Sequence, residues 1–229
     1  MGQAPGFFGK LPSHGDFVGR RLPPDVRDRF DRWLQAGIVR SKEDLGDAWL
    51  ATWLSSPLWR FLVGEGVCGG QAWAGVMMPS HDRVGRCFPL LLMAGVDGSP
   101  SLRECLTVHA GWFGRLEELA LLSLLDTFTI AMLDSGLADM EGMPGGAVVD
   151  GGHPGERRER PDAWAAVSAL EPGQLPALAG QPLGGASAWW THGSAQVQPC
   201  LAICAGLPAA RGFAAMLDGD WVTRDRHLQ

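Results

Sequence analysis

Two apolar runs of strand length, separated by one short polar loop, constrain the fold of this chain most strongly. Residues 72–78 read Ala-Trp-Ala-Gly-Val-Met-Met, and residues 88–96 read Phe-Pro-Leu-Leu-Leu-Met-Ala-Gly-Val. Runs this apolar are typical of strands in a buried sheet, and a short connection predicts that the two strands pair. Pro79 and Gly85 mark where the connection leaves and rejoins regular structure. We therefore predict a central strand pair with a polar loop at the sheet edge.

This loop resembles an earlier stretch of the same chain. Residues 79–86 read Pro-Ser-His-Asp-Arg-Val-Gly-Arg, and residues 12–20 read Pro-Ser-His-Gly-Asp-Phe-Val-Gly-Arg. The similarity is too short to be a structural repeat of the kind that builds solenoids. It predicts two loops with similar turns, and we expect residues 10–20 and 79–86 to converge into one surface or cleft.

The charged side chains of the two loops suggest how each loop is held. We expect Asp16 and Asp82 to accept backbone N–H groups of their own loops, or to pair with Arg20 or Arg86. A loop fixed in this way presents a rigid surface to a protein partner, which reduces the ordering cost of binding. The candidate binding residues are Lys10, Pro12, Gly15, Asp16, Arg20, Pro79, Ser80, Asp82, Gly85 and Arg86.

An enzymatic function is the alternative interpretation of these loops. Ser80, His81 and Asp82 are adjacent, but neighbouring side chains on an extended backbone point in opposite directions, whereas catalytic triads are assembled by the fold. Ser80 could use His14 and Asp16 if the loops meet, although no Gly-x-Ser-x-Gly elbow is present. The same imidazoles and carboxylates suit several divalent ions, but their spacing selects none. We predict no catalytic residue, metal or cofactor, and keep a hydrolase or metal-dependent enzyme as the alternative.

Charge and composition exclude other classes of function. The formal net charge of −6 argues against nucleic-acid binding, which requires a clustered basic surface. No apolar segment reaches the roughly 18 residues of a membrane span, and the amino terminus lacks the pattern of an export signal. Five cysteines without a zinc-binding pattern indicate reduced thiols, so we expect a cytoplasmic protein. Ten tryptophans and no tyrosine predict many large core or interface anchors.

Helices and strands alternate along the chain, which favours a layered α/β architecture. We predict a single domain over residues 1–229, with a mixed sheet because its centre is a hairpin. Residues 140–161 are rich in Gly and Pro, which predicts a mobile loop. The other predicted strands are 6–10, 58–63, 187–191 and 199–205, with a last extended segment at 221–222. The predicted helices are 25–36 (ending at Gly37), 42–54, 100–106, 113–137, 162–170 and 211–217.

The predicted helix over 113–137 is apolar on more than one side. Leu116, Leu119, Ala120, Leu122 and Leu124 do not fall on a single stripe. A helix of this kind is buried between layers or against a partner.

Several of these motifs together resemble one known family. Residues 6–18, Gly-Phe-Phe-Gly-Lys-Leu-Pro-Ser-His-Gly-Asp-Phe-Val, are followed by Arg20 and Arg21. The pattern continues with Ser-Pro-Leu-Trp-Arg-Phe at 56–61 and Gly-Val-Met-Met-Pro-Ser-His-Asp-Arg-Val-Gly-Arg at 75–86. The shorter matches are Trp33-Leu34, Phe88-Pro89, Trp189-Trp190 and Gly206-Leu207-Pro208. The sequence resembles the TagF family of type VI secretion system-associated proteins over nearly its whole length.

The resemblance implies both a fold and a function. Members of the family are similar to a three-layer α/β/α sandwich, and they act after translation as cytoplasmic repressors of type VI secretion. The implied partner is the forkhead-associated scaffold protein of the system. No enzymatic activity is implied for this domain.

Overall fold

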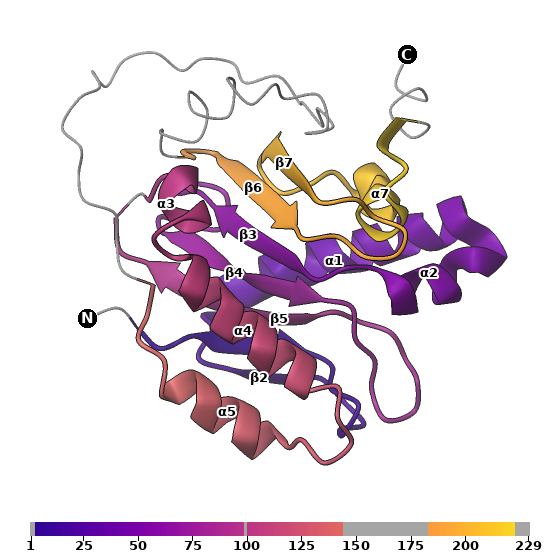
Figure 1. Ribbon diagram of the computed structural model, residues 1–229, viewed down its shortest axis with the longest axis horizontal. Helices are drawn as coiled ribbons and strands as arrows, with labels where there is room; N and C mark the ends of the chain where they lie inside the picture. The colour runs from indigo at the N-terminus through magenta and orange to yellow at the C-terminus, as the bar shows by residue number, and fades with distance from the viewer. Residues whose placement is uncertain (1–2, 99, 144–182, 223–229) are drawn as a thin grey trace.

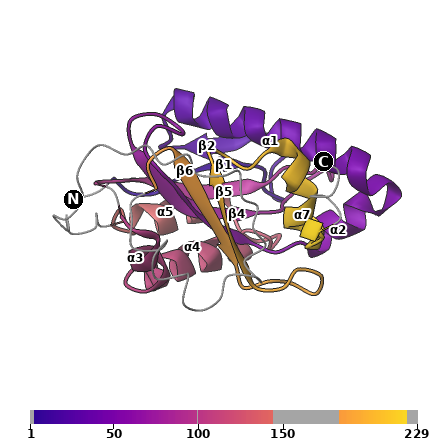
Figure 2. The ribbon, with the colours of Figure 1, turned by 90° about the horizontal axis from the view of Figure 1, so that it is seen from above.

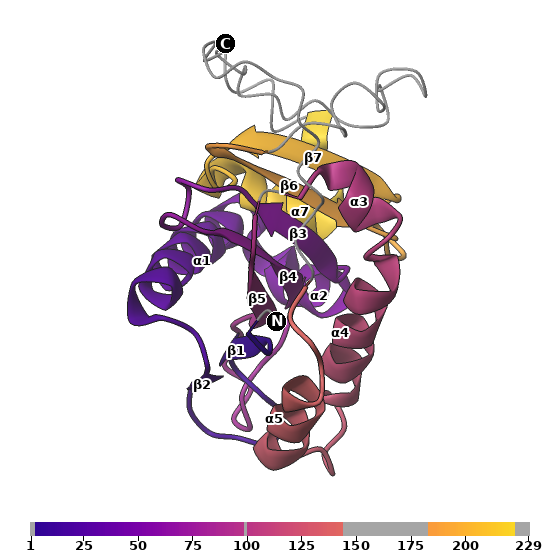
Figure 3. The same cartoon turned by 90° about the vertical axis from the view of Figure 1, so that its left-hand side faces the viewer.

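The computed structural model describes residues 3–98, 100–143 and 183–222, and in these residues the chain forms one seven-stranded sheet between two layers of helices (Figures 1 and 3). This confirms the predicted three-layer α/β/α sandwich. The spatial order of the strands is β2-β1-β5-β4-β3-β6-β7. Their bounds are β1 (Gly6–Gly9), β2 (Val18–Arg20), β3 (Trp59–Val63), β4 (Ala72–Met78), β5 (Leu90–Val96), β6 (Ala186–Thr191) and β7 (Cys200–Ala205).

The predicted central hairpin is confirmed, but the described part of the sheet is antiparallel and not mixed as predicted. Strand β4 pairs with β5 from Ala72 opposite Val96 to Met78 opposite Leu90. Each of the six pairings among the described strands is antiparallel. The pairs β1–β2, β3–β4, β4–β5 and β6–β7 join strands that follow each other through short connections. Such connections return the chain alongside itself and cannot make the crossover that parallel strands need.

Helices cover each face of the sheet and bury a separate apolar core against it (Figure 2). Within β4, Val76 belongs to one core and Met77 to the other, as the alternation of a strand requires. Two buried faces explain why the central strands are apolar throughout. One face is covered by α1 (Pro24–Leu45), η1 (Gly46–Ala48), α2 (Trp49–Ser55), η3 (Ala210–Gly212) and α7 (Phe213–Asp218). The other is covered by α3 (Leu102–Leu106), α4 (Ala110–Leu122) and α5 (Ile130–Ala138).

The first helix is longer than predicted, because Gly37 does not end it. Helix α1 continues to Leu45 and ends at Gly46, whose φ of 51° is readily adopted by glycine. Gly37 is buried within the helix, where it faces the ring of Phe213. The predicted helix over 42–54 is therefore divided between the end of α1, the turn η1 and α2.

The predicted long helix over 113–137 is two helices, α4 and α5. The hydroxyl of Ser123 donates to the carbonyl of Ala120 at 2.6 Å, at the end of α4. Thr129 begins α5, because its hydroxyl accepts the amide of Met132 at 3.3 Å. Hydroxyl groups that compete for backbone partners are favoured at helix ends, and here they outweigh the apolar run.

Other predictions near the carboxyl end had mixed outcomes. Residues 144–161 of the predicted mobile loop and the predicted helix 162–170 lie outside the described residues. Residues Met140 and Met143, at the start of that loop, are buried in the core. Trp221 and Val222 are helical and not extended. The buried tryptophans confirm the predicted anchors, and they are Trp49, Trp53, Trp59, Trp73, Trp189 and Trp190.

Candidate protein-binding site

The two loops singled out in the sequence meet at one end of the neighbouring strands β1, β5 and β4. Residues 10–17 join β1 to β2 and residues 79–89 join β4 to β5, and we refer to them as the paired loops. Because β1 pairs with β5, with Gly9 opposite Leu90, the two hairpin ends are neighbours. A Cβ added at Gly9 would lie 2.0 Å from the carbonyl oxygen of Pro89, so only glycine permits this approach.

Asp82 is the centre of the paired loops and is fully buried. Its Oδ2 accepts from Lys10 Nζ at 3.0 Å and from Arg86 Nε at 2.7 Å. Its Oδ1 accepts the backbone amides of Val84 at 3.1 Å and Arg86 at 2.9 Å. The turn closes at Gly85, whose φ is 81°. This carboxylate therefore fixes its own loop and also binds the first loop through Lys10.

The protonation of Asp82 follows from these contacts. Burial alone would raise the pKa of its carboxyl group, because it removes water from the charged form. The amide of Arg86, the side chains of Lys10 and Arg86, and the amide of Val84 outweigh burial and hold that pKa well below its usual range. Asp82 is thus an anion at neutral pH, and it is balanced by two cations.

Further bonds join one loop to the other. Arg86 Nη2 donates to the carbonyl of Gly15 at 2.6 Å, and the amide of Arg83 donates to the carbonyl of His14 at 2.8 Å. Ser80 Oγ donates to the carbonyl of Lys10 at 2.8 Å. Lys10 Nζ also donates to the carbonyl of Arg86 at 3.3 Å. The predicted convergence of the loops is therefore confirmed, since four bonds besides the pairing of Lys10 with Asp82 span them.

A buried tryptophan of α2 is hydrogen-bonded to one of the paired loops. The indole N–H of Trp53 in α2 donates to the carbonyl of Ser80 at 3.1 Å, and its ring stacks on Trp49 with centroids 5.2 Å apart. From the sequence, Trp53 was predicted only to lie in the helix over 42–54. A donor on a buried Trp usually finds a partner, and this was the one signal available in the sequence.

Two apolar side chains of the paired loops are exposed. Phe17 is 45% exposed, and its ring lies 4.8 Å from that of Phe88 and 5.7 Å from that of Phe8. Lys10 Nζ lies 5.0 Å from the centre of the Phe17 ring, within the range of a cation–π contact. Val84 is 68% exposed. The loops thus present a fixed aromatic ring and an aliphatic side chain to solvent.

Arg20 and Asp16, both candidate residues, do not pair with each other. Arg20 and Arg21 bind the carboxylate of Asp134 in α5, on another part of the molecule. Burial would raise the pKa of Asp134, but its bonds to Arg21 and Arg20 outweigh that effect and lower it. Asp16 accepts the amide of Phe17 at 2.7 Å, as a turn-capping residue of its own loop. Arg20 therefore lies outside the paired loops and joins β2 to α5.

The Ser, His and Asp side chains do not assemble into a triad. Ser80 is 2% exposed, and its hydroxyl donates to a backbone carbonyl. The Nδ1 atom of His14 is bonded to Ser13 Oγ at 3.0 Å, and that of His81 to the carbonyl of Asp82 at 3.0 Å. Across residues 3–98, 100–143 and 183–222, no group of three or more His, Cys, Asp or Glu side chains is arranged to hold a metal ion. In the same part of the chain, none of the helices combines the length and apolarity of a membrane span.

Comparison with known proteins identifies the class to which this fold and these loops belong. The TagF N-terminal domain family, described as type VI secretion system-associated, matches residues 6–140. The chain therefore belongs to the TagF family, which confirms the resemblance found in its sequence.

A solved structure extends the similarity to almost the whole chain. The crystal structure of PA0076 from Pseudomonas aeruginosa PAO1 is 37% identical, with a TM-score of 0.80 over 95% of each chain. No curated protein matches.

Proposed function

We propose that this protein is a non-catalytic, post-translational negative regulator of type VI secretion that acts in the cytoplasm. In this proposal it binds the forkhead-associated scaffold protein of the system through the paired loops. Membership of a type VI secretion-associated family supports the biological setting. The choice of this surface rests on Asp82, whose buried carboxylate pairs with Lys10 and Arg86 and so holds both loops in one conformation.

The paired loops are already ordered before any partner binds, which lowers the entropic cost of binding. Binding through a mobile loop costs conformational entropy, whereas a loop already held by internal bonds binds without that loss. Phe17 is held between neighbouring rings yet remains 45% exposed, and a fixed aromatic side chain is the usual centre of a protein interface. Val84 and the side chain of Arg86, which is 61% exposed, extend the surface around it.

The direct test is calorimetric titration of the purified protein with the forkhead-associated scaffold protein of the same secretion system. We expect binding by the natural chain and at least tenfold weaker binding by Phe17→Ser and by Val84→Asp. The matched control is Val39→Asp in α1, because Val39 is 59% exposed and lies outside the paired loops. Val39→Asp should bind like the natural chain.

Secretion in cells provides the second measurement. Cells that carry Val84→Asp in place of the natural gene should secrete as much as cells that lack the gene, while Val39→Asp should restore repression. Absence of binding by the natural chain would reject the proposal. Equal loss of binding in the Val39 and Val84 variants would reject the paired loops as the surface.

The enzymatic alternative has no specific observation in its favour among the described residues. The hydroxyl of Ser80 is used to join the loops, and both oxygens of Asp82 are occupied by donors. We therefore do not propose a hydrolase or a metal-dependent enzyme.

A further inference from the structure

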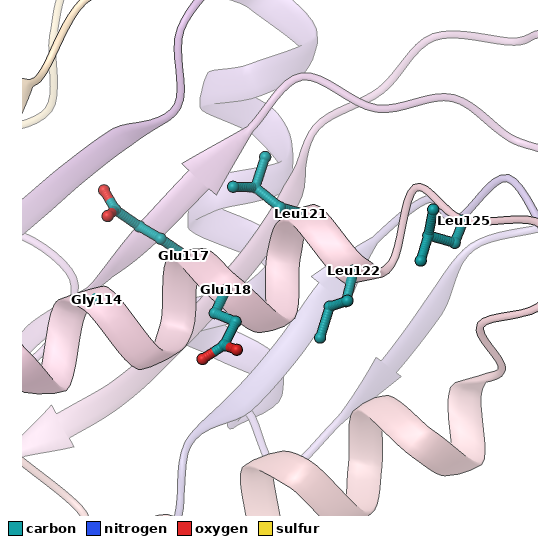
Figure 4. Close-up of a pocket in the computed structure, with 6 residues that line it drawn as sticks. All are labelled: Gly114, Glu117, Glu118, Leu121, Leu122 and Leu125. Atoms are coloured by element: carbon teal, nitrogen blue, oxygen red, sulfur yellow. The ribbon is translucent and has the colours of Figure 1, made fainter.

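Helix α4 has a second apolar face that does not contact the sheet. Phe113, Leu116 and Ala120 are buried in the core, whereas Leu121 is 55% exposed, Leu122 is 38% exposed and the following Leu125 is 53% exposed. The exposed leucines border a pocket of about 440 Å³ (Figure 4). The residues that line it, which we call the leucine groove, are Gly114, Glu117, Glu118, Leu121, Leu122 and Leu125.

The spacing of these residues is that of a helix–helix contact. Positions 114, 118 and 121 of α4 follow one another at intervals of four and three residues, and Leu125 lies just beyond the end of the helix at Leu122. Residues at these intervals lie on one face of a helix and form the contact seam when two helices pack side by side. Figure 4 shows Glu118 and Leu122 on one side of the helix axis, and Glu117 and Leu121 on the other.

Gly114 gives the groove an open end. A Cβ added at Gly114 would meet nothing within 4 Å, so no other part of the chain fills the space beside this residue. A missing side chain at this position allows another backbone to approach α4 closely.

The charges of the groove indicate what approaches it. The charge of Glu117 is neutralised by a bidentate ion pair with Arg60, in which Oε1 accepts from Nε at 2.8 Å and Oε2 accepts from Nη2 at 2.6 Å. Glu118 has no hydrogen-bond or ion-pair partner in the described part of the chain, so the uncompensated charge of the groove is negative. Two copies of the chain packed through this face would bring like charges together, and the whole chain carries a net charge of −6.

We propose that the leucine groove binds an amphipathic helix of another protein, one that presents leucine-sized side chains and a Lys or Arg toward Glu118. This is the helix-in-groove mode of recognition, in which apolar side chains supply affinity and the charge selects the partner. The groove shares no residue with the paired loops, so this inference does not depend on the proposed function.

Two designed helical peptides with identical leucine seams test the proposal, one with lysines and one with glutamates beside the seam. Fluorescence anisotropy with the full chain should show at least tenfold tighter binding of the lysine peptide. Glu118→Lys, at the surface of α4, should reverse this preference. Gly114→Gln should weaken binding of the lysine peptide at least tenfold. Gly111→Gln should not, because Gly111 lies on the same helix outside the groove and its added Cβ also meets nothing within 4 Å.

Several outcomes would overturn the proposal. These are no binding of either peptide, equal binding of both, no change of preference in Glu118→Lys, or equal weakening by both glycine variants. Sedimentation of the natural chain as a dimer that Gly114→Gln dissociates would assign the groove to a second copy, and would equally overturn it. Far-ultraviolet circular dichroism of each variant establishes that it is folded before it is titrated.

Discussion

The ring of Phe213 in α7 lies directly against the backbone of Gly37 in α1. A Cβ added at Gly37 would lie 2.5 Å from Cδ2 of that ring, closer than packed carbon atoms approach each other. Trp33 joins the same contact, with its ring 5.8 Å from that of Phe213. Helices α1 and α7 are thus packed together at Gly37, which has no side chain.

Gly37→Ala should destabilise the protein despite the higher helix propensity of alanine. We expect a loss of about 1–3 kcal/mol in the free energy of unfolding, because Phe213 must shift in a packed core. Urea denaturation measures it. The control is Gly111→Ala in α4, where an added Cβ meets nothing and stability should rise by about 0.5–1 kcal/mol. If Gly37→Ala left the free energy of unfolding unchanged, α1 and α7 would not be tightly packed at this position.

Asp82→Asn should destabilise the protein in a way that depends on pH. The pKa of Asp82 in the folded state is lowered from an ordinary value of 3.8. Its ion pairs therefore contribute full stability above about pH 4, and this contribution declines as the pH falls toward the folded pKa. Urea unfolding should show a large difference from the natural chain at pH 7 and a smaller one at pH 3. Asp16→Asn, which changes an exposed carboxylate, should show little difference at pH 7.

Glu117→Gln should destabilise the protein through its effect on Arg60. Arg60 in β3 is 8% exposed and lies against the ring of Phe113, so loss of its anionic partner leaves a nearly buried cation unpaired. We expect a loss of about 1.5–3 kcal/mol in the free energy of unfolding. The adjacent Glu118→Gln should change it by less than about 0.5 kcal/mol. Adding Arg60→Met to Glu117→Gln should recover part of the loss, and a purely additive double variant would contradict this account.

Asp134→Ala should loosen α5 without unfolding the sheet. Its carboxylate binds Arg20 and Arg21 at the end of β2, and these bonds join the helix to the edge of the sheet. Because Arg20 is 53% exposed, we expect a modest loss of about 1 kcal/mol. Hydrogen exchange should accelerate in residues 130–138 and not in β4. Asp139→Ala, at the end of the same helix, is the control.

The sequence predicted the layers better than the ends of the elements. Apolar runs at 72–78 and 88–96 located the central hairpin, because strands with both faces buried allow almost no polar residue. Gly37 was wrongly predicted to end a helix. The ring that fills the space beside Gly37 belongs to Phe213, which is too distant in the sequence for a local pattern to reveal the contact. The sheet was incorrectly predicted to be mixed for a similar reason. The pairing of β3 with β6, for example, joins residues more than 120 positions apart.

The candidate site was predicted in part. Asp82 and Arg86 lie four residues apart in one loop, so their pairing follows from local chemistry. The contact of Lys10 with Asp82 was not predicted, although both residues were candidates. Asp16 accepts an amide of its own loop, which was one of the two predicted alternatives. The pairing of Arg20 with Asp134 was not predicted, because Asp134 lies 114 residues away and on a helix that the sequence merged with its neighbour.

The close approach of Gly9 to Pro89 has a consequence for evolution and engineering. Any residue with a side chain at position 9 would push β1 away from Pro89 and Leu90, and it would have to adopt a φ of 142°, which side chains other than that of glycine disfavour. Such a change would alter the relative position of the paired loops, so one added methyl group next to Lys10 would test the binding surface proposed above without replacing any side chain on it.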